Sequence, residues 1–440
     1  MLLQTDEQTI EDLRLFARRE QTGIYDIYND TFTRGGEAVL EKMFRNPLSD
    51  LAAITTRATI IASFRRLNTD FPFEVAVLDS VEKYMTHPKE NADNNQKSAL
   101  AEKEINNGVS AIIDLFHAVH DFIMKGDIIQ VEALNNQRKE MIDLLHDTAL
   151  EPVFNEKPKA KLSYAASMAF DILIRVRERD KVIKVLQFIY LLDVFISVAK
   201  IANKRNFIFP TAHPKGSSII KMEGVYHPEL KTPVSNNLTM DANKTVVFLT
   251  GANMAGKSTF LRSFSTALFV AHVGFPVAAQ SMDFTVMDGI YTTINLPDNL
   301  GIGASHFYAE VLRVKKIATE LGAGKSLFVL FDELFRGTNV KDAHEGTVAI
   351  TQAFARKKSS LFIISSHIVE AGDTLKQQSN IGFHYLPTKM NGHIPEYTYT
   401  LQEGITDDRH GMVIIQNEGI LETLKKGIKN NNFSVAVKNF

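Results

Sequence analysis

The 440-residue sequence contains no cysteine, which excludes disulfide bonds, thiolate zinc sites and cysteine nucleophiles. It also lacks a basic excess: 49 Lys and Arg residues against 51 Asp and Glu residues give a net charge of −2. Dedicated nucleic-acid binders usually carry a surplus of positive charge, so composition alone does not favour DNA as a partner. The thirteen histidines are scattered without the spacing of metal ligands, and no structural metal is expected from the sequence.

Targeting signals and membrane spans are not evident either. Residues 1–7 lack the basic and apolar regions of a signal peptide. The most apolar stretch, residues 182–202, is interrupted by charged residues, among them Lys184, Asp193 and Lys200. We therefore predict that this stretch is a core helix, that the protein has no membrane partner, and that it is cytoplasmic.

The character of the sequence changes near residue 205. Residues 5–203 have helical periodicity, with two long helices expected at about 97–125 and 127–150 on either side of Gly126. Residues 206–216, which contain two prolines, resemble a linker. Beyond them, strands alternate with helices, as in a βαβ nucleotide-binding domain. The sequence predicts two domains, 1–205 and 206–440.

A glycine-rich loop of the form G-x-x-x-x-G-K-S lies between a predicted buried strand at 246–250 and a predicted helix from 260. Backbone N–H groups of such a loop can surround a phosphate, and the helix N-terminus adds partial positive charge. Lys257 can reach the β- and γ-phosphates, and the Ser258 hydroxyl can bind Mg²⁺. The predicted ATP-binding residues of the loop are Gly251, Ala252, Asn253, Met254, Ala255, Gly256, Lys257, Ser258 and Thr259.

Two further apolar strands end in residues that suit phosphate chemistry. The strand at 327–331 is followed by Asp332 and Glu333. Behind such a loop, we predict that Asp332 holds Mg²⁺ through water and that Glu333 activates the attacking water, although paired acids at a strand end are often only a solvated turn. The strand from 361 ends at His367, a candidate sensor of the γ-phosphate.

The remaining motifs closely resemble those of the MutS family of DNA mismatch-repair ATPases. The loop matches T-G-x-N-M-x-G-K-S-T, with the Asn253-Met254 pair as its most specific feature, and the acidic strand matches D-E-x-x-x-G-T. Segments 224–228, 303–307 and 397–404 match as well. Residues 33–48 and 191–194 resemble the family's core, or lever, domain. The resemblance is strong over about 185–415, moderate over 24–67, and unspecific between them.

The resemblance implies an ABC-type ATPase that uses ATP and Mg²⁺ and works as a dimer with two composite sites. In such a site, Ser305 would reach the γ-phosphate bound by the other subunit, although a serine there can also be an ordinary helix N-cap. Tyr399 and Val234 lie where the family places residues against the adenine ring; a core tyrosine is an equally good interpretation of Tyr399.

The sequence also departs from the family's full-length pattern. Its core-like segment begins within the first thirty or so residues, so the mismatch-reading and connector domains are expected to be absent. The Phe-x-Glu triplets at 154–156 and 331–333 do not match the mismatch-reading motif. The helical region is too short for two full levers and a DNA clamp. The chain also ends too soon after the ATPase domain for the C-terminal nuclease of the second bacterial class.

We therefore predict a multidomain α and α/β protein, an all-helical core (lever) domain followed by an ABC-type P-loop ATPase domain. The predicted function is ATP hydrolysis at composite dimer sites that controls DNA binding, in mismatch repair or recombination. The expected partners are DNA, a second copy of the chain and other repair proteins. An ATPase that acts on a protein partner without touching DNA is the alternative. A transporter subunit would need an L-S-G-G-Q signature, which segment 303–306 does not provide.

Overall fold

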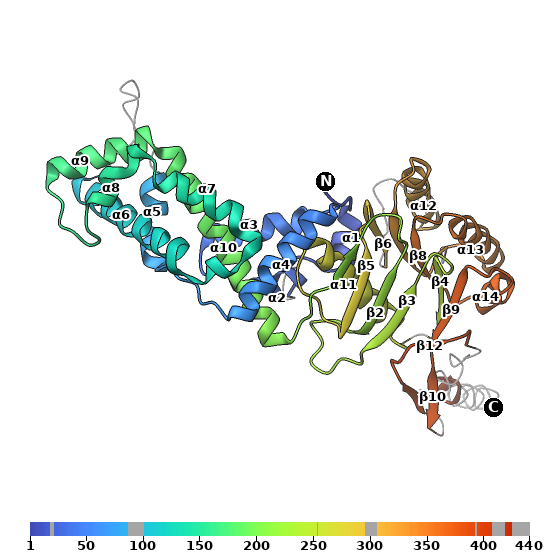
Figure 1. Ribbon diagram of the computed structural model, residues 1–440. Helices are drawn as coiled ribbons and strands as arrows, with labels where there is room; N and C mark the ends of the chain where they lie inside the picture. The colour runs from blue at the N-terminus through green and yellow to red at the C-terminus, as the bar shows by residue number, and fades with distance from the viewer. Residues whose placement is uncertain are drawn as a thin grey trace, which may run out of the picture.

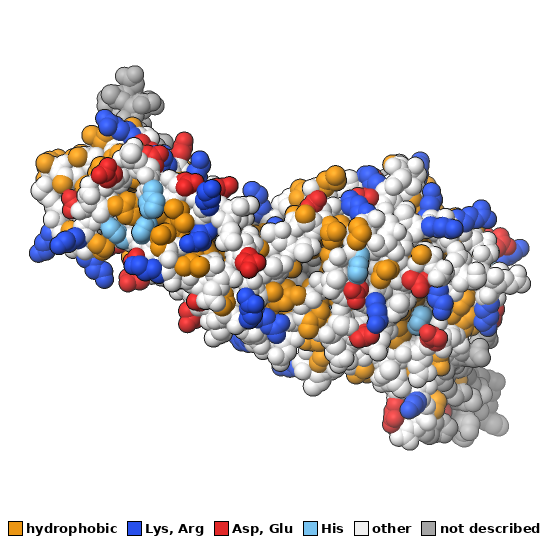
Figure 2. Space-filling model, in the orientation of Figure 1, with side chains coloured by type: hydrophobic (Ala, Val, Ile, Leu, Met, Phe, Trp, Pro, Cys, Tyr) orange, Lys and Arg blue, Asp and Glu red, His pale blue; other side chains and the backbone are white. Residues whose placement is uncertain are grey.

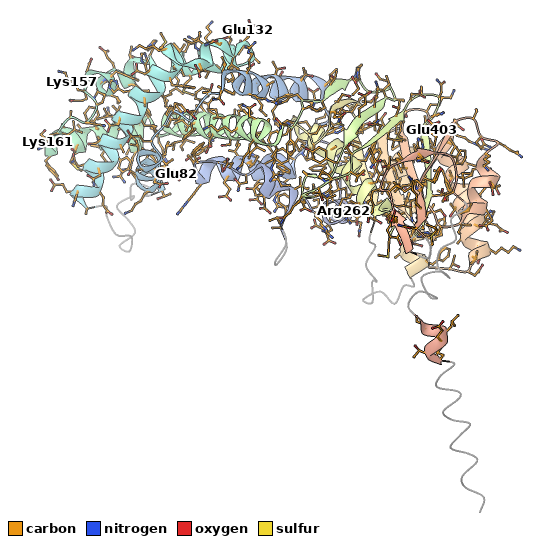
Figure 3. The ribbon with its side chains drawn as sticks, turned by 90° about the horizontal axis from the view of Figure 1, so that it is seen from below. Glu82, Glu132, Lys157, Lys161, Arg262 and Glu403 are labelled. Carbon is orange, nitrogen blue, oxygen red and sulfur yellow. The ribbon has the colours of Figure 1, made fainter. Side chains whose placement is uncertain are left out.

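The computed structural model describes residues 1–17, 22–86, 101–252, 254–294, 306–335, 337–391, 394–406 and 419–424. A helical part is followed by an α/β part, as the sequence predicts, and it extends from the α/β part as an arm (Figure 1). Lys157 and Lys161 lie at the far end of this arm, whereas Glu403 lies in the α/β part (Figure 3). The domain boundary at residue 205 stays a prediction.

The helical part is built from helices of very different length. Its α-helices are α1 (Glu7–Asp12), α2 (Ile24–Tyr28), α3 (Arg34–Arg45), α4 (Leu51–Leu67), α5 (Val75–Thr86), α6 (Glu102–Lys125), α7 (Asn135–Leu145), α8 (Glu151–Asn155), α9 (Tyr164–Ile172) and α10 (Arg179–Arg205). Short 3₁₀ turns form η1 (Asp127–Gln130), η2 (Glu132–Leu134) and η3 (Thr148–Leu150), and a π-helical turn forms η4 (Leu173–Arg177).

The prediction of a single helix over 127–150 was wrong, because this segment is broken into η1, η2, α7 and η3. Ile128, Val131 and Leu134 are all fully buried. Their spacing of three residues matches the three residues per turn of a 3₁₀-helix, whereas an α-helix would rotate successive members off one face. Burial of these three side chains explains the 3₁₀ turns at the start of the segment.

The apolar helix α10 forms the centre of the arm. It is long and apolar enough to cross a membrane by length and composition. Its apolar side chains are nevertheless mostly buried, and it lies against α3 and α4. The buried Asp193 carboxylate accepts hydrogen bonds from the backbone N–H of Phe32 (3.0 Å) and of Thr33 (2.8 Å). These contacts are those of a core helix.

The α/β part contains two main sheets and a hairpin. The strands are β1 (Thr211–His213), β2 (Ile220–Val225), β3 (Asn236–Met240), β4 (Val246–Gly251), β5 (Ser281–Thr285), β6 (Gly289–Thr293), β7 (Leu327–Asp332), β8 (Leu361–Ser365), β9 (Ile381–Leu386), β10 (Thr388–Asn391), β11 (Ile394–Tyr397) and β12 (Gln402–Glu403). The six-stranded sheet has the order β12-β9-β4-β8-β7-β6 and is parallel except at β12. The four-stranded sheet has the order β1-β5-β2-β3, and β10 pairs with β11.

Helices cover both faces of the six-stranded sheet. Helix α11 (Lys257–Val273) lies on one face, and α12 (His306–Gly322), α13 (Val340–Ala355) and α14 (Val369–Leu375) belong to the other. Alternate residues of β4 therefore enter different cores: Val247 and Leu249 share a cluster with α11, whereas Phe248 shares one with the other three helices. Because both faces are covered, β4 is apolar at every position up to Leu249, as in buried parallel strands.

The first residues of the chain join the α/β part. Gln4 pairs with Gly289 at the edge of β6, where its N–H donates to Asp288 and its C=O accepts from Ile290. Asp6 then caps α1 by accepting from the Thr9 N–H. The N-terminal segment thus extends the six-stranded sheet before the chain enters the helical arm.

Candidate functional site: a phosphate-binding loop and an acidic strand end

The loop after β4 joins a buried strand to a helix, which is the arrangement predicted for a phosphate-binding loop. Strand β4 lies between β8 and β9, and α11 begins at Lys257, directly after Gly256. Gly256 has a φ of 95° and would place a Cβ only 2.8 Å from Cδ1 of Tyr399. Glycine is therefore required here both by the backbone conformation and by the close approach of Tyr399. Met254, also left-handed with a φ of 69°, points its side chain into solvent.

Lys257 is held inside this loop. Its ammonium donates hydrogen bonds to the backbone carbonyls of Gly251 (2.7 Å) and Ala252 (3.1 Å). Burial lowers the pKa of Lys257, and the nearby carboxylates of Asp332 and Glu333 oppose that shift. The structure thus brings a buried cation and the two acids predicted from sequence into one site.

Asp332, at the end of β7, accepts two hydroxyl hydrogen bonds. The Ser258 hydroxyl donates to Oδ2 (2.5 Å), and the Ser365 hydroxyl, from the neighbouring end of β8, donates to Oδ1 (2.6 Å). Hydroxyl and carboxylate oxygens are ligands that Mg²⁺ accepts. This donor set fits the metal, and Ser258 and Asp332 are the residues that would hold it. Ser365 was missed from sequence because a serine in an apolar strand gives no signal of its own.

Glu333 and His367 contact each other across the ends of β7 and β8. The distance from His367 Nε2 to Glu333 Oε1 is 2.6 Å. Glu333 has a φ of 63°, and its N–H donates to the Ser365 carbonyl. A non-glycine residue in this left-handed conformation is strained, and such strain is concentrated at functional sites. The conformation directs the Glu333 side chain to His367.

A cavity of about 250 Å³ lies beside the loop, on the side of the four-stranded sheet. It is lined by Val225, His227, Leu230, Thr232, Val234, Asn236, Gly256, Thr259, Phe260, Ser263 and Tyr399. The wall is mainly apolar with a few polar groups, as in sites that take a flat aromatic ligand. The structure thus places Val234 and Tyr399 on the same cavity as loop residues Gly256 and Thr259.

One buried atom in this wall supports the fit of a nucleotide base. Among the described residues, Nε2 of His227 is buried without a hydrogen-bond partner. Burial first, and then the charges of Arg262 and Arg14, lower the pKa of His227 to about 4, so the ring is neutral at pH 7. An uncharged imidazole nitrogen at the wall can exchange a hydrogen bond with a heterocyclic ring, as adenine provides.

Asn236 fixes the position of Tyr399. Its side-chain amide donates to the Tyr399 carbonyl (2.9 Å), and its side-chain oxygen accepts from the Leu401 N–H (2.6 Å). Tyr399 has a φ of 54°, so its backbone needs such support. Sequence analysis missed Asn236 because its two partners lie more than 160 residues away along the chain.

Two of the predicted site residues, Asn253 and Ser305, lie outside the residues that the structure describes. Of the others, the loop residues, Asp332, Glu333 and His367 lie at the ends of β4, β7 and β8, whereas Val234 and Tyr399 line the cavity beside the loop. Their roles in binding and catalysis stay predictions.

The part of the chain that carries this site is similar in sequence to known proteins. A family model described as MutS domain V matches residues 247–431. The DNA mismatch repair protein MutS of Persephonella marina is 28% identical over 304 residues, which are 67% of this chain and 34% of that protein. The protein of the same name from Lactobacillus acidophilus is 30% identical over 270 residues, 58% of this chain and 31% of the relative.

A third relative gives the same extent of similarity. The DNA mismatch repair protein MutS of Listeria monocytogenes is 27% identical over 282 residues, 61% of this chain and 32% of its own length. The chain thus spans about a third of the length of the relatives it matches.

Proposed function

The chain belongs to the MutS family through its domain V, and from this premise we propose that it is an ABC-type P-loop ATPase that couples ATP hydrolysis to DNA binding in mismatch repair or recombination. The observation that carries the proposal is the convergence of Lys257, Ser258, Asp332, Glu333 and His367 at the ends of β4, β7 and β8. Such a group of residues combines phosphate binding, metal binding and water activation in one place.

In the proposed site, ATP lies along the loop from Gly251 to Thr259. Lys257 neutralises phosphate charge, and Ser258 and Asp332 hold Mg²⁺, which when bound offsets the charge on the phosphate oxygens. The base occupies the cavity between Val234 and Tyr399. The same cavity wall includes His227, whose Nε2 would contribute a polar group for a purine edge, and Asn236, which positions Tyr399.

Glu333 is the proposed base that removes a proton from the attacking water. Its hydrogen bond with His367 orients the carboxylate at the sheet edge where the phosphates end. His367 is also proposed to sense the γ-phosphate, because it follows the strand adjacent to the loop strand. A base of this kind typically contributes about 10²–10⁴-fold to the rate.

Two copies of the chain are proposed to form two composite sites, with Ser305 of each completing the site of the other. Exposed apolar side chains of the loop, of α12 and of α13 support such a contact. Met254 and Val340 are 72% and 74% exposed, and Tyr308 and Leu312 are exposed on α12. A second subunit would cover these side chains, which a monomer leaves in water at a free-energy cost.

The choice between DNA and a protein partner can be tested with the whole chain. We expect ATPase activity to change on addition of at least one of four DNAs: homoduplex, mismatched, branched or single-stranded. Binding to that DNA should weaken as salt rises, because phosphate contacts release counterions. Lys257→Ala is the matched control, since it should lose the ATPase activity in every mixture. An active ATPase that binds none of the four DNAs at low salt would instead support the protein-partner alternative.

A further inference from the structure

A second cavity, of about 470 Å³, lies on the helical arm, away from the ATP site. Its wall consists of His117, His120, Leu145, His146, Asp147, Thr148, Glu151 and Phe154. Figure 2 shows histidine side chains (pale blue) among hydrophobic ones (orange) on the surface of this arm. Three of the thirteen histidines are therefore gathered at one place by the fold, although their sequence spacing showed no such cluster.

The central pair consists of His120 on α6 and His146 at the C-terminal end of α7. Their Nε2 atoms are 3.3 Å apart, and the ring centroids are separated by 5.4 Å. Two imidazole nitrogens bound to one tetrahedral Zn²⁺, each about 2.0–2.1 Å from the ion, lie about 3.3–3.4 Å apart. The two nitrogens thus already have the separation that a shared ion requires.

Phe154 packs against one ring of the pair, that of His120, and the Nε2 atoms of His120 and His146 are each other's hydrogen-bond partners. Phe154 of α8 contacts the ring of His120, with centroids 5.7 Å apart, and that of His117, with centroids 5.3 Å apart. Nε2 of His117 is hydrogen-bonded to the backbone carbonyl of Glu156 (2.9 Å). Among the residues described, His120 and His146 have no side-chain hydrogen bond other than the one between them.

The two carboxylates that line the cavity differ in whether they already form an ion pair. Asp147 is bound to Lys181 (2.6 Å) and accepts from the Ala149 N–H (2.9 Å), so it is not available. Glu151, by contrast, is exposed at the start of α8 and makes no ion pair within the described part of the chain. It is the acidic side chain of this wall that can turn toward the two imidazoles.

We propose that His120 and His146 bind one divalent transition-metal ion of the Zn²⁺ class, with Glu151 and water completing its coordination. No set of three ready-placed His, Asp or Glu ligands occurs in the described ranges, so the third protein ligand requires a side-chain rotation of Glu151. Imidazole nitrogen favours Zn²⁺, Cu²⁺ and Ni²⁺ over Mg²⁺, which prefers oxygen. The ion would tie α6 to the segment around α7 and α8, and it is distinct from the Mg²⁺ of the ATP site.

The proposal can be tested by calorimetric titration of the whole chain with Zn²⁺. The protein should carry no histidine tag, should be treated with chelator, and should be free of nucleotide. We expect one Zn²⁺ per chain, and millimolar Mg²⁺ should not displace it. His120→Gln and His146→Gln should each weaken binding at least about 10-fold, whereas His344→Gln, on α13 and remote from the cavity, should leave it unchanged.

Glu151→Gln tests the third ligand, because glutamine keeps the size but loses the charge. It should weaken Zn²⁺ binding without changing the stoichiometry. Since these side chains lie at the surface or line an open cavity, far-ultraviolet circular dichroism should show that each variant keeps its helices. Equal affinity in the His120→Gln, His146→Gln and unchanged proteins would overturn the site. Equal affinity in Glu151→Gln would overturn the assignment of that carboxylate.

Discussion

Two neighbouring acids have different hydrogen-bond partners at the edge of the six-stranded sheet. Both carboxylate oxygens of Asp332 accept hydrogen bonds from serine hydroxyls, whereas the Glu333 carboxylate is hydrogen-bonded to the imidazole of His367. Hydroxyl donors can be exchanged for metal coordination without leaving a charge unpaired, which suits Asp332 as a metal ligand. An imidazole can orient a carboxylate, which suits Glu333 as a base. The different partners explain how adjacent acids can serve different roles.

Replacing Glu333 by glutamine tests this division of roles. Glutamine keeps the size and can still accept a hydrogen bond from His367, but it cannot take a proton from water. We expect ATP hydrolysis to fall about 10²–10⁴-fold while ATP binding is retained. Single-turnover hydrolysis and equilibrium binding of a fluorescent ATP analogue measure the two quantities separately. Hydrolysis at the parent rate in Glu333→Gln would rule out Glu333 as the base.

The site residues that can be predicted from the sequence are those that belong to continuous motifs. Lys257 and Ser258 are recognisable because they belong to the continuous loop motif after β4, and Asp332 and Glu333 because they stand at the end of a buried strand. Strand ends of a parallel sheet meet at one edge, which predicts that the two motifs lie together. Asn236 and Ser365 could not be found in this way, since each acts on a partner distant in the chain. The same limit applies to the histidine pair on the arm, which tertiary packing alone brings together.

Among the elements, α11 connects the loop after β4 with the helical arm. It begins at Lys257, and the carbonyl of its last residue, Val273, accepts a hydrogen bond from Arg57 of α4 (2.6 Å). Midway along the helix, Arg262 donates to the Asp12 carbonyl of α1 (2.7 Å). Figure 3 labels Arg262 where the arm meets the α/β part. Hydrogen bonds thus connect the helix that follows the loop to side chains or backbone of α4 and α1.

Element boundaries were predicted best where a strand is buried on both faces. The apolar runs before Asp332 and His367 became β7 and β8 because every residue in them enters a core. The helical arm was harder, since burial of Val131 and its neighbours produces 3₁₀ turns where no proline or glycine marks a break. Periodicity identifies a helical region, but tertiary contacts decide where each helix ends.

His272 makes α11 sensitive to acid. It is fully buried, with Nδ1 on the Leu268 carbonyl (2.9 Å) and Nε2 accepting from the Met287 N–H (3.0 Å). Burial lowers the pKa of His272 to about 4. In the unfolded chain this histidine binds a proton as the pH falls through about 6.5, whereas in the folded chain it stays neutral down to about pH 4. The free energy of unfolding therefore keeps its full value, as far as this group is concerned, above pH 6.5 and decreases as the pH falls toward 4. The slope is about 1.4 kcal/mol per pH unit for this one group.

Urea unfolding at pH 7, 6 and 5 measures this slope. His272→Gln lowers stability at every pH because it disturbs a buried site, but it removes one titrating group. We therefore expect a shallower decrease in the free energy of unfolding between pH 6 and pH 5 in the variant than in the parent protein. His344→Gln on α13 serves as the control for removing a histidine outside α11. Parallel pH profiles for His272→Gln and the parent would show that His272 is not the titrating group.

At the scale of the molecule, one long helix and one short segment join the two parts. Helix α10 has 27 residues and spans about 40 Å, which carries it along the arm to the α/β part (Figure 1). The second connection is the N-terminal segment. Its Asp6 carboxylate accepts hydrogen bonds from Arg313 and from Lys316 (2.6 Å) of α12. These charged contacts hold the Asp6 pKa well below its usual range, although burial opposes the shift. Residues 4–12 thus contact both β6 and α12 of the α/β part.

The proposed dimer makes a prediction about the whole assembly. Glu333→Gln should trap ATP, and trapped ATP should hold two α/β parts together because its γ-phosphate would be shared between the loop of one subunit and Ser305 of the other. Light scattering with and without ATP and Mg²⁺ should then show an ATP-dependent rise in mass or compactness. Lys257→Ala should abolish the rise by weakening nucleotide binding itself.

Ser305→Arg separates closure of the dimer from binding of the nucleotide. The added side chain should leave ATP binding nearly intact, because the loop of the same subunit is unchanged, yet it should block both association and turnover by occupying the shared position. ATP binding, light scattering and hydrolysis on this one variant distinguish the two steps. If Ser305→Arg hydrolyses ATP at the parent rate, or if Glu333→Gln does not respond to ATP in size or shape, each subunit completes its site alone and the composite arrangement is wrong for this chain.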